Sequence, residues 1–271
     1  MSRISPLSAV DPKAVIADDV EIGPFCVIGP NVTLGPGNRL LSHVVIDGHT
    51  TVGRNNLFHP HCAIGGLPQD LKYKGGPTRL EIGDHNDIRE AVTIHIGTEV
   101  GGGVTRVGNH NLLMINCHVA HDVVIGNHCI LANNVCLAGH VVCGNGVNMM
   151  GMVGIHHFVT VGDFAYLGGM ARIRHDVPPF VKVDGSDYVR GLNKEGLRRA
   201  HFNDLDIDAL ETACRRLFGR EVPLAVAMAS LGTDREINPH VAKLLEFLHR
   251  RNLGKHGRYL EGRRPPESYG N

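Results

Sequence analysis

The chain has 271 residues, with 27 basic and 27 acidic side chains and no tryptophan. This balance of charge argues against a dedicated nucleic-acid-binding protein. The hydrophobic content of 42% excludes a chain that is disordered throughout, and the length allows one large domain with or without an appendage.

The cysteines and the N-terminal residues exclude further classes. The seven cysteines are scattered and form no CxxC pair, so we expect neither a disulfide framework nor a thiolate zinc site. The opening residues, MSRISPLSAVDPKAV, lack the apolar stretch of a secretory signal. No segment is long and apolar enough to span a membrane, so we expect a cytoplasmic protein.

Much of the chain repeats with a period of six residues. From Ile16 to Ile64 every sixth residue is apolar, and the period resumes over residues 82–94 and, one residue out of phase, over residues 107–173. Neither a helix nor an ordinary strand has this period, whereas short strands joined by tight turns do, three to a coil of about 18 residues. We therefore predict a mainly β fold, a left-handed parallel β-helix of hexapeptide repeats, over residues 10–190.

Two segments interrupt the period and are expected to be loops ejected from the coils. They cover residues 66–78 and 97–104. Long loops on a regular scaffold are often functional. The first loop carries Gln69, Asp70 and Lys72, which makes it a candidate binding segment.

The period ends near the sequence DVPPF, and helical patterns follow. We expect a C-terminal α-helical domain over residues 191–254, in which Asn193 caps a short helix that ends at Arg199. Further helices are predicted over residues 206–219, 223–231 and 239–252. Residues 255–271 are predicted to be a flexible basic tail.

Histidines gather at one edge of successive predicted coils. Because residues about 18 apart stack in this fold, His121, Gly139 and His157 share a column. Their neighbours include His118, His140 and His156. A histidine beside a carboxylate, as His121 beside Asp122, can serve as a general base, and Gly139 leaves its backbone N–H open to an oxyanion.

The column has two other interpretations. One is a polar ladder at a subunit interface, in a β-helix that serves as a trimeric scaffold. The other is zinc held between subunits, as in the γ class of carbonic anhydrases, which share this fold. The spacing here does not match the His-x4-His pair of that class.

Three stretches resemble the UDP-N-acetylglucosamine 3-O-acyltransferase family. They are DLKYKGGPTRLEIGDHNDIREAVTIHIGT, NLLMINCHVAHDVVIGNHCILANN and LAGHV, and DVPPF and GLNKEGLRR extend the resemblance to roughly residues 10–250. The resemblance implies a homotrimer with active sites in clefts between adjacent β-helices. It implies transfer of an (R)-3-hydroxyacyl group from acyl carrier protein to the glucosamine 3-hydroxyl of UDP-N-acetylglucosamine, the first step of lipid A biosynthesis. A thioester is already activated, so no cofactor is expected.

The resemblance also implies roles for individual residues. His121 matches the general base, Asp122 the residue that orients it, and Gly139 the oxyanion donor. The positions that match substrate-binding residues are Gln69, Asp70, Lys72, His118, His140, His156, Asn193, Glu195 and Arg199. The run from Arg250 to Arg264 is rich in basic residues, which makes it either a docking face for an acidic carrier protein or a solvated tail.

Two positions bear on acyl length, and two others depart from the family pattern. Gly169 matches the position that sets acyl length and leaves room for a longer chain, although Met170 beside it could shorten the groove. His157 stands where many members carry Gln. Ala200 stands where some carry a second Arg after Arg199, so nucleotide affinity would rest on one guanidinium.

The nearest rival function is the 2-N-acyltransferase of the same pathway. Relatives of that kind carry an N-terminal uridine-binding domain, for which the repeats, beginning at Ile16, leave no room. The loop over residues 66–78 and the helical nucleotide segment argue against both the carbonic anhydrase and the scaffold. The preferred acyl length and the choice between a 3-hydroxyl and a 3-amino acceptor stay open.

Overall fold

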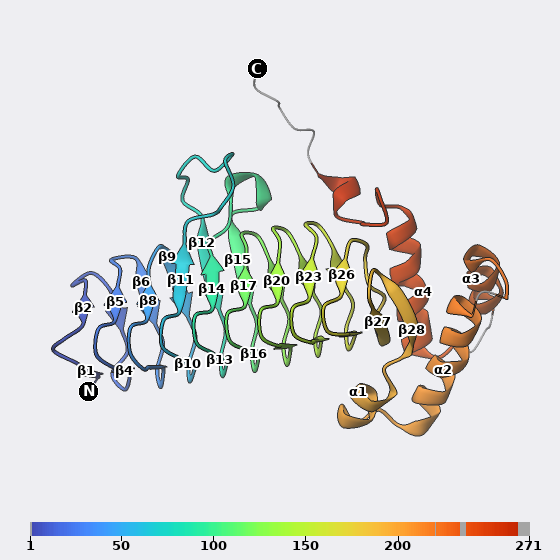
Figure 1. The fold of residues 1–271 in the computed structure, drawn as a ribbon, viewed down its shortest axis with the longest axis horizontal. Helices are drawn as coiled ribbons and strands as arrows, with labels where there is room; N and C mark the ends of the chain where they lie inside the picture. Colours follow the sequence, from blue (N-terminus) through green and yellow to red (C-terminus); the bar gives the residue numbers. More distant parts are fainter. Residues whose placement is uncertain (1, 220, 234–236, 265–271) are drawn as a thin grey trace, which may run out of the picture.

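The computed structural model describes residues 2–219, 221–233 and 237–264. Short strands stack into a triangular rod, and a group of helices packs beside its C-terminal end (Figure 1). The rod has three parallel sheets, one for each side of the triangle, so the predicted mainly β fold with a parallel β-helix is confirmed.

The first sheet has eleven strands, and only its last pair is antiparallel. In spatial order they are β1 (Arg3–Ile4), β4 (Glu21–Ile22), β7 (Arg39–Leu40), β10 (Leu57–Phe58), β13 (Asp87–Ile88), β16 (Leu112–Leu113), β19 (Ile130–Leu131), β22 (Asn148–Met149), β25 (Tyr166–Leu167), β27 (Val181–Asp184) and β28 (Tyr188–Leu192).

The second sheet has nine strands and the third has eight. The second comprises β2 (Ala9–Val10), β5 (Val27–Ile28), β8 (Val45–Ile46), β11 (Ala63–Gly66), β14 (Thr93–His95), β17 (His118–Val119), β20 (Cys136–Leu137), β23 (Gly154–Ile155) and β26 (Arg172–Ile173). The third comprises β3 (Val15–Ile16), β6 (Val32–Leu34), β9 (His49–Val52), β12 (Arg79–Ile82), β15 (Val104–Val107), β18 (Val124–Ile125), β21 (Val142–Cys143) and β24 (Thr160–Val161).

The six-residue period fills the inside of the rod. Val119, Leu137 and Ile155 lie directly above one another and are at most 3% exposed. Across the interruptions Ile64 pairs with Ile94, and Ile94 with Val119, so both loops are ejected without a break in the stack. Burial of one aliphatic side chain per hexad stabilises the coil by about 1.5–3 kcal/mol at each position.

Buried asparagines support one inner corner of the rod. They are Asn38, Asn56, Asn86 and Asn111. The Asn56 Oδ1 atom accepts bonds from the backbone N–H (2.8 Å) and the side chain (2.9 Å) of Asn86. The Asn86 Oδ1 atom in turn accepts from the backbone N–H of Asn111 at 2.9 Å. The Oδ1 atom of each asparagine thus satisfies a backbone N–H of the next coil, which allows these polar side chains to lie inside the rod.

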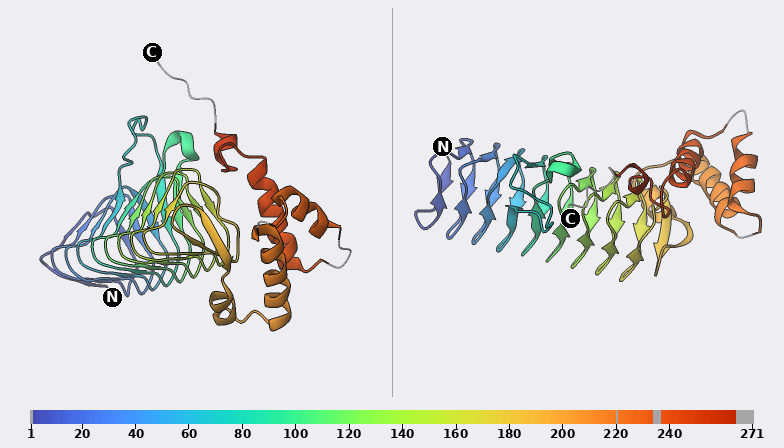
Figure 2. Two further views of the ribbon diagram at one scale, coloured as in Figure 1. Left: turned by 45° about the vertical axis from the view of Figure 1, so that its right-hand side comes forward. Right: turned by 90° about the horizontal axis from the view of Figure 1, so that it is seen from above.

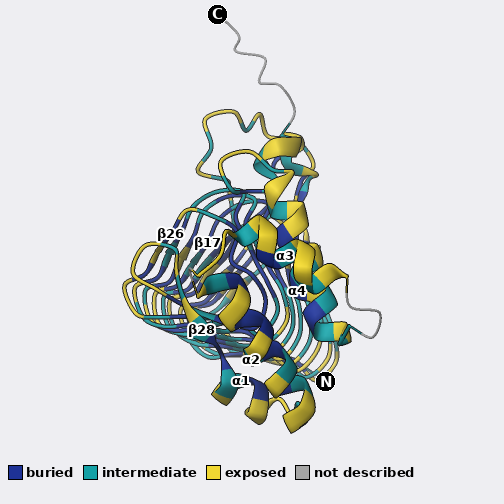
Figure 3. Cartoon of the chain, turned by 90° about the vertical axis from the view of Figure 1, so that its right-hand side faces the viewer, coloured by how far each residue is buried: buried dark blue, intermediate teal, exposed yellow. Residues whose placement is uncertain are grey.

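Among the described residues, four α-helices follow the rod: α1 (Lys194–Arg199), α2 (Asp204–Phe218), α3 (Leu224–Gly232) and α4 (Pro239–Asn252). Each helix has buried residues on one side and exposed residues on the other (Figure 3), and the buried ones are mainly apolar. Asn193 caps α1 through its side chain, as the sequence indicates. The second helix begins at Asp204 and not at residue 206, because the Asn203 side chain caps it by accepting from the N–H of Asp206 at 2.8 Å.

The structure differs from the predicted boundaries at both ends. The first coil already begins at Arg3, since Ile4 and Val10 continue the six-residue period and Ile4 pairs with Ile22. Residues 255–264 are not a flexible tail: they pack against the last coil and include a 3-10 helix, Glu261–Arg263. The rest of the predicted tail, residues 265–271, lies outside the described residues. No helix in the described part of the chain is long and apolar enough to cross a membrane.

Candidate active site

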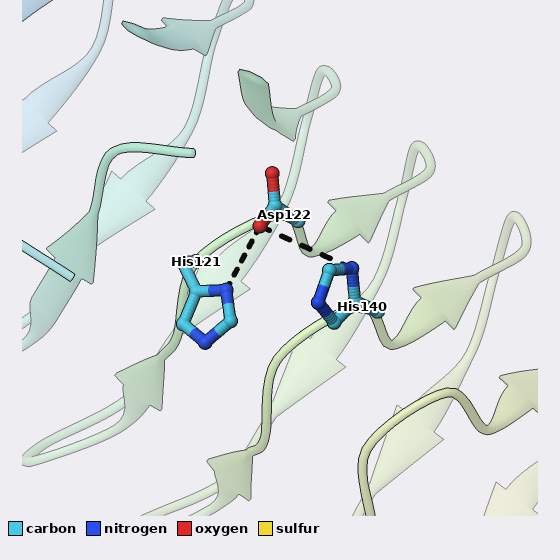
Figure 4. A group of neighbouring side chains, drawn as sticks. All are labelled: His121, Asp122 and His140. Carbon is cyan, nitrogen blue, oxygen red and sulfur yellow. Dashed lines mark hydrogen bonds and ion pairs between the residues drawn. The ribbon is translucent and has the colours of Figure 1, made fainter. Parts of the chain in front are cut away.

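A left-handed corner of the rod brings His121 and Asp122 together. Neighbouring residues in a strand point to opposite faces, so their side chains cannot meet there. Asp122 has φ 59°, a conformation that costs a non-glycine residue about 1–2 kcal/mol. The bend turns its carboxylate toward the preceding ring, with the His121 Nδ1 atom 2.8 Å from Asp122 Oδ2 (Figure 4). The corner therefore pairs an imidazole with a carboxylate from two consecutive residues.

The second ejected loop fixes the Asp122 carboxylate. Thr98 donates its backbone N–H to Oδ1 at 2.9 Å and its hydroxyl to Oδ2 at 2.6 Å. Burial alone would raise the pKa of Asp122, but the bonds from His121 and Thr98 outweigh it and lower the pKa below its ordinary value. Asp122 is therefore an ionised, buried acceptor that holds the proton of His121 on Nδ1 and leaves Nε2 as the basic nitrogen.

Gly139 lies one coil along the rod from His121, directly against the imidazole ring. A methyl group built on Gly139 would lie 2.5 Å from Cε1 and 2.7 Å from Nε2 of His121. Only glycine leaves room for the ring at this position. No acceptor in the described part of the chain takes the backbone N–H of Gly139, so this donor is open to a ligand beside the basic nitrogen.

His140 lies on the other side of the His121–Asp122 pair. Its ring meets that of His121 edge to face, with centroids 5.2 Å apart, and stacks on Phe158 at 4.2 Å. Its Nδ1 atom is 3.9 Å from Asp122 Oδ2. Burial lowers the pKa of His140 to about 4, so it is neutral near pH 7 and can donate or accept a hydrogen bond without adding charge.

His118 and His95 form a second pair beside His121. The His118 Nδ1 atom lies 2.7 Å from the Thr93 hydroxyl, and burial together with His121 lowers the pKa of His118. His95 meets His118 edge to face at 4.9 Å, and burial lowers its pKa to about 4. Both rings are therefore neutral, polar surfaces next to the base.

Two cavities meet at His121 and Gly139, which line both of them. The larger, about 650 Å³, extends over His140 and His157 and is bordered by Asp70 and Lys72 of the first loop. The smaller cavity, about 500 Å³, is lined by the predicted residues Gln69, His118 and His156 and also by Arg172 and Arg174. A base and an N–H donor thus lie where two bound molecules would come together.

Three predicted site residues lie outside both cavities of this chain. The short helix α1 lies at the edge of the rod away from the ejected loops (Figures 1 and 2). Asn193 is buried and bonds the Phe164 carbonyl at 2.9 Å, and Glu195 pairs with Arg198 at 3.0 Å. Arg199 follows on the same helix. A single chain does not bring these residues to His121.

The two residues predicted to set acyl length also lie apart from the cavities. Gly169 and Met170 form a corner between β25 and β26, and Met170 is 76% exposed with φ 60°. A methyl group on Gly169 would meet the Gly151 carbonyl oxygen at 3.6 Å and the Met150 Cβ atom at 3.9 Å, both ordinary contacts. The space that Gly169 leaves is therefore on the outer surface of this chain.

Sequence reasoning missed several residues around the site. They are Thr98, His95, Arg172 and, from the C-terminal segment, Leu260, Arg263 and Arg264. The register of the coils could have placed His95 and Arg172, because they lie in the same sheet as His118. No pattern in the sequence indicates that the C-terminal segment returns to the column of histidines.

His121, Asp122 and His140 also form a group that could hold a metal ion, with one ligand atom from each within 4.8 Å of the others. It is the group of at least three His, Cys, Asp or Glu residues in the described part of the chain whose ligand atoms lie this close together. The Nδ1 atom of His121 already bonds Asp122, so an ion held by this histidine would bind at its Nε2 atom.

The chain is similar to proteins of known structure over most of its length. The family model for domain 2 of UDP-N-acetylglucosamine O-acyltransferase matches residues 176–256, and the hexapeptide-repeat model matches residues 13–48 and 105–139. The Moraxella catarrhalis UDP-N-acetylglucosamine O-acyltransferase is 42% identical, covers 90% of this chain and 95% of its own, and superposes with a TM-score of 0.85.

Two further similar enzymes have lower sequence identity to this chain. The Francisella novicida UDP-N-acetylglucosamine acyltransferase is 35% identical over 91% of each chain, with a TM-score of 0.87. The Arabidopsis enzyme of the same name is 34% identical over 94% of this chain and 98% of its own, with a TM-score of 0.82. The chain is an acyltransferase and belongs to the UDP-N-acetylglucosamine O-acyltransferase family.

Proposed function

We propose that this enzyme transfers an (R)-3-hydroxyacyl group from acyl carrier protein to the glucosamine 3-hydroxyl of UDP-N-acetylglucosamine, the first step of lipid A biosynthesis, in the cytoplasm. The observation that carries the proposal is the meeting of two cavities at His121 and Gly139. One cavity suits the nucleotide sugar and the other the acyl arm. The base and the N–H donor lie at their junction, where the two substrates react.

The chemistry follows from the geometry of the pair. The His121 Nε2 atom removes the proton of the sugar hydroxyl as that oxygen attacks the thioester carbonyl. The tetrahedral oxyanion accepts a hydrogen bond from the Gly139 N–H, a contact worth about 10²–10³ in rate. When the intermediate collapses, the thiolate of the carrier leaves and takes the proton from the imidazolium. Asp122 keeps the ring oriented and stabilises its charge.

Substrate contacts come from segments around this pair. We assign Gln69, Asp70 and Lys72 to the sugar and the acyl chain. We assign His118 and His140 to the sugar and its diphosphate side, and His156 to a further substrate contact. We further propose that the acyl chain extends toward Gly169 and Met170.

We propose that the enzyme is a homotrimer whose sites are shared between adjacent subunits. In support, Asn193, Glu195 and Arg199 are remote from this chain's own His121, as they would be if they reached a neighbour's nucleotide. Mixing His121→Ala with Arg199→Ala subunits after joint unfolding and refolding should then restore turnover, because some interfaces combine the intact halves. Absence of any recovery above the separate variants would contradict shared sites.

The first experiment is a direct assay of acyl transfer. The purified enzyme is mixed with UDP-N-acetylglucosamine and a panel of (R)-3-hydroxyacyl carrier proteins, and acylated nucleotide sugar is detected by mass spectrometry. We expect product, and at least about 10²-fold less from His121→Ala. His128→Ala is the matched control, since His128 is a corner histidine that stacks on His110 and lines neither cavity. Product only from the 3-amino analogue would change the acceptor, and no product from either would contradict the proposal.

A zinc enzyme like the γ-class carbonic anhydrases remains the second candidate, because His121, Asp122 and His140 lie close enough to hold an ion. Removal of metal with a chelator separates the two. Acyl transfer by the proposed mechanism is unchanged by the chelator, whereas a zinc enzyme loses its activity and regains it with added Zn²⁺.

A further inference from the structure

The C-terminal strap, which we define as residues 254–264, runs from the end of α4 back toward the ejected loops (Figures 1 and 2). Leu260, Arg263 and Arg264 of the strap line the larger cavity together with His121 and His140. The strap is thus one wall of the candidate active site, in a cavity that Lys72 also lines.

Asp176 fastens the strap to the last coil. This residue is 3% exposed, and its Oδ2 atom accepts the backbone N–H of Tyr259 at 2.7 Å, while Oδ1 accepts the N–H of Thr160 at 2.7 Å. Its own N–H donates to the carbonyl of Gly257 at 2.8 Å. Gly257 has φ 67° and lies so close to His175 that a methyl group would be 2.7 Å from the ring. The path of the strap is therefore set by buried contacts.

Within the strap, the charge of Glu261 is neutralised by a buried cation. Arg258 is 8% exposed, bonds the Arg174 carbonyl at 2.9 Å and pairs with Glu261 at 3.3 Å. Glu261 also lies 3.7 Å from the His157 Nε2 atom. The strap thus supplies a partner for His157.

Three cations and two carboxylates line this cavity. The cations are Arg263 and Arg264 of the strap and Lys72 of the first loop, and the carboxylates are Asp70 and Asp122, of which Asp122 is bonded to His121. The Arg264 guanidinium lies 3.6 Å from Glu261 and 5.4 Å from the Phe158 ring, and its side chain is 31% exposed. A guanidinium in this setting can reach an anionic ligand and bind it through two parallel hydrogen bonds.

We propose that Arg264, with Arg263 beside it, binds a phosphate group of a substrate at the mouth of the catalytic cavity. This inference rests on the proposed function, in which both substrates carry phosphate: the diphosphate of the nucleotide sugar, and the phosphodiester of the prosthetic arm on the carrier protein. The two sources share one chemistry, so the experiment must distinguish them.

Steady-state kinetics of Arg264→Gln and Arg263→Gln identify the source. We expect Arg264→Gln to raise one KM about tenfold and to leave kcat within threefold, and Arg264→Lys to retain part of the affinity. A rise in the KM for UDP-N-acetylglucosamine assigns the diphosphate. A rise in the KM for acyl carrier protein that vanishes with acyl-pantetheine, which lacks the phosphate, assigns the arm. Arg216→Gln is the control, because Arg216 lies on α2 and bonds Ser230.

A binding measurement tests the phosphate site without requiring any acyl transfer. Inorganic pyrophosphate and 4′-phosphopantetheine are titrated by calorimetry into the wild-type enzyme and into Arg264→Gln. Binding of either ligand at least tenfold more tightly to the wild type supports the phosphate site, even if no acyl product is found in the assay above. Unchanged KM values and unchanged binding in a folded variant would overturn it, as would an equal loss for both ligands together with a lower melting temperature.

Discussion

The Gly139→Ala substitution should displace the His121 ring while leaving the histidine itself in place. The added methyl group would lie 2.5 Å from Cε1 of His121, where real contacts begin near 3.4 Å, so the ring must move by about 1 Å. A displacement of that size at a reacting group costs about 10²-fold in rate, and the methyl also covers the N–H that faces the oxyanion. We expect kcat to fall by about 10²–10³, which is about 3–4 kcal/mol in activation free energy.

The stability of the Gly139→Ala variant should change much less than its rate. A strained rotamer of His121 costs about 0.5–1.5 kcal/mol, while alanine lowers the entropy of the unfolded chain and gains about 0.4–1 kcal/mol. Initial rates by mass spectrometry and a urea unfolding curve measure the two effects. Gly232→Ala is the control, because a methyl group there meets nothing within 4 Å. A kcat within threefold of wild type, in a folded variant, would refute the assigned position of the base.

Three further predictions follow from buried groups. Asp122→Asn removes the acceptor that sets the His121 tautomer, so kcat should fall at least about 10²-fold with the circular dichroism spectrum preserved; a smaller loss would argue against the orienting role. The pKa of His95 is lowered to about 4, so the unfolded chain binds a proton before the folded one as pH falls, and stability declines between about pH 6.5 and 4; His95→Gln should flatten the dependence of the urea midpoint on pH in this window, and an identical slope would contradict it. Asn86→Ala leaves the backbone N–H of Asn111 without its acceptor and should lower the free energy of unfolding by about 2–4 kcal/mol, measured by urea denaturation, where an unchanged midpoint would count against the ladder.

The fold was accessible from the sequence because its repeat is short and strictly kept. One buried residue per six, as at Val119 and Leu137, specifies both the side of the triangle and the register of the coils. The same register predicts that His121 and Gly139 share a column, and in the structure the two residues lie against each other. What it could not give is the bond between His121 and Asp122, which depends on the left-handed φ of the second residue.

The segments outside the repeat were harder to predict. The strap carries no hydrophobic period, and its position depends on bonds between Asp176 and the backbone of residues far along the chain. Composition alone describes such a segment as a solvated basic tail, because a single buried carboxylate leaves no trace in a pattern of charges. The ejected loop over residues 66–78 was found only as an interruption of the period. Where Lys72 lies relative to His121 follows from the folded loop.

The residues on the coils and the residues on the added segments have different roles in the proposed mechanism. His121, Asp122 and Gly139 stand on coils that are paired above and below, so their mutual positions are as rigid as the stack itself. Part of the wall of the larger cavity comes from segments added to the stack, the two ejected loops and the strap, whose side chains form no ladder bonds. Substitutions at Arg264 should therefore change affinity while folding and the catalytic pair persist. This division explains how one rigid pair of residues can be combined with different substrate contacts in related chains.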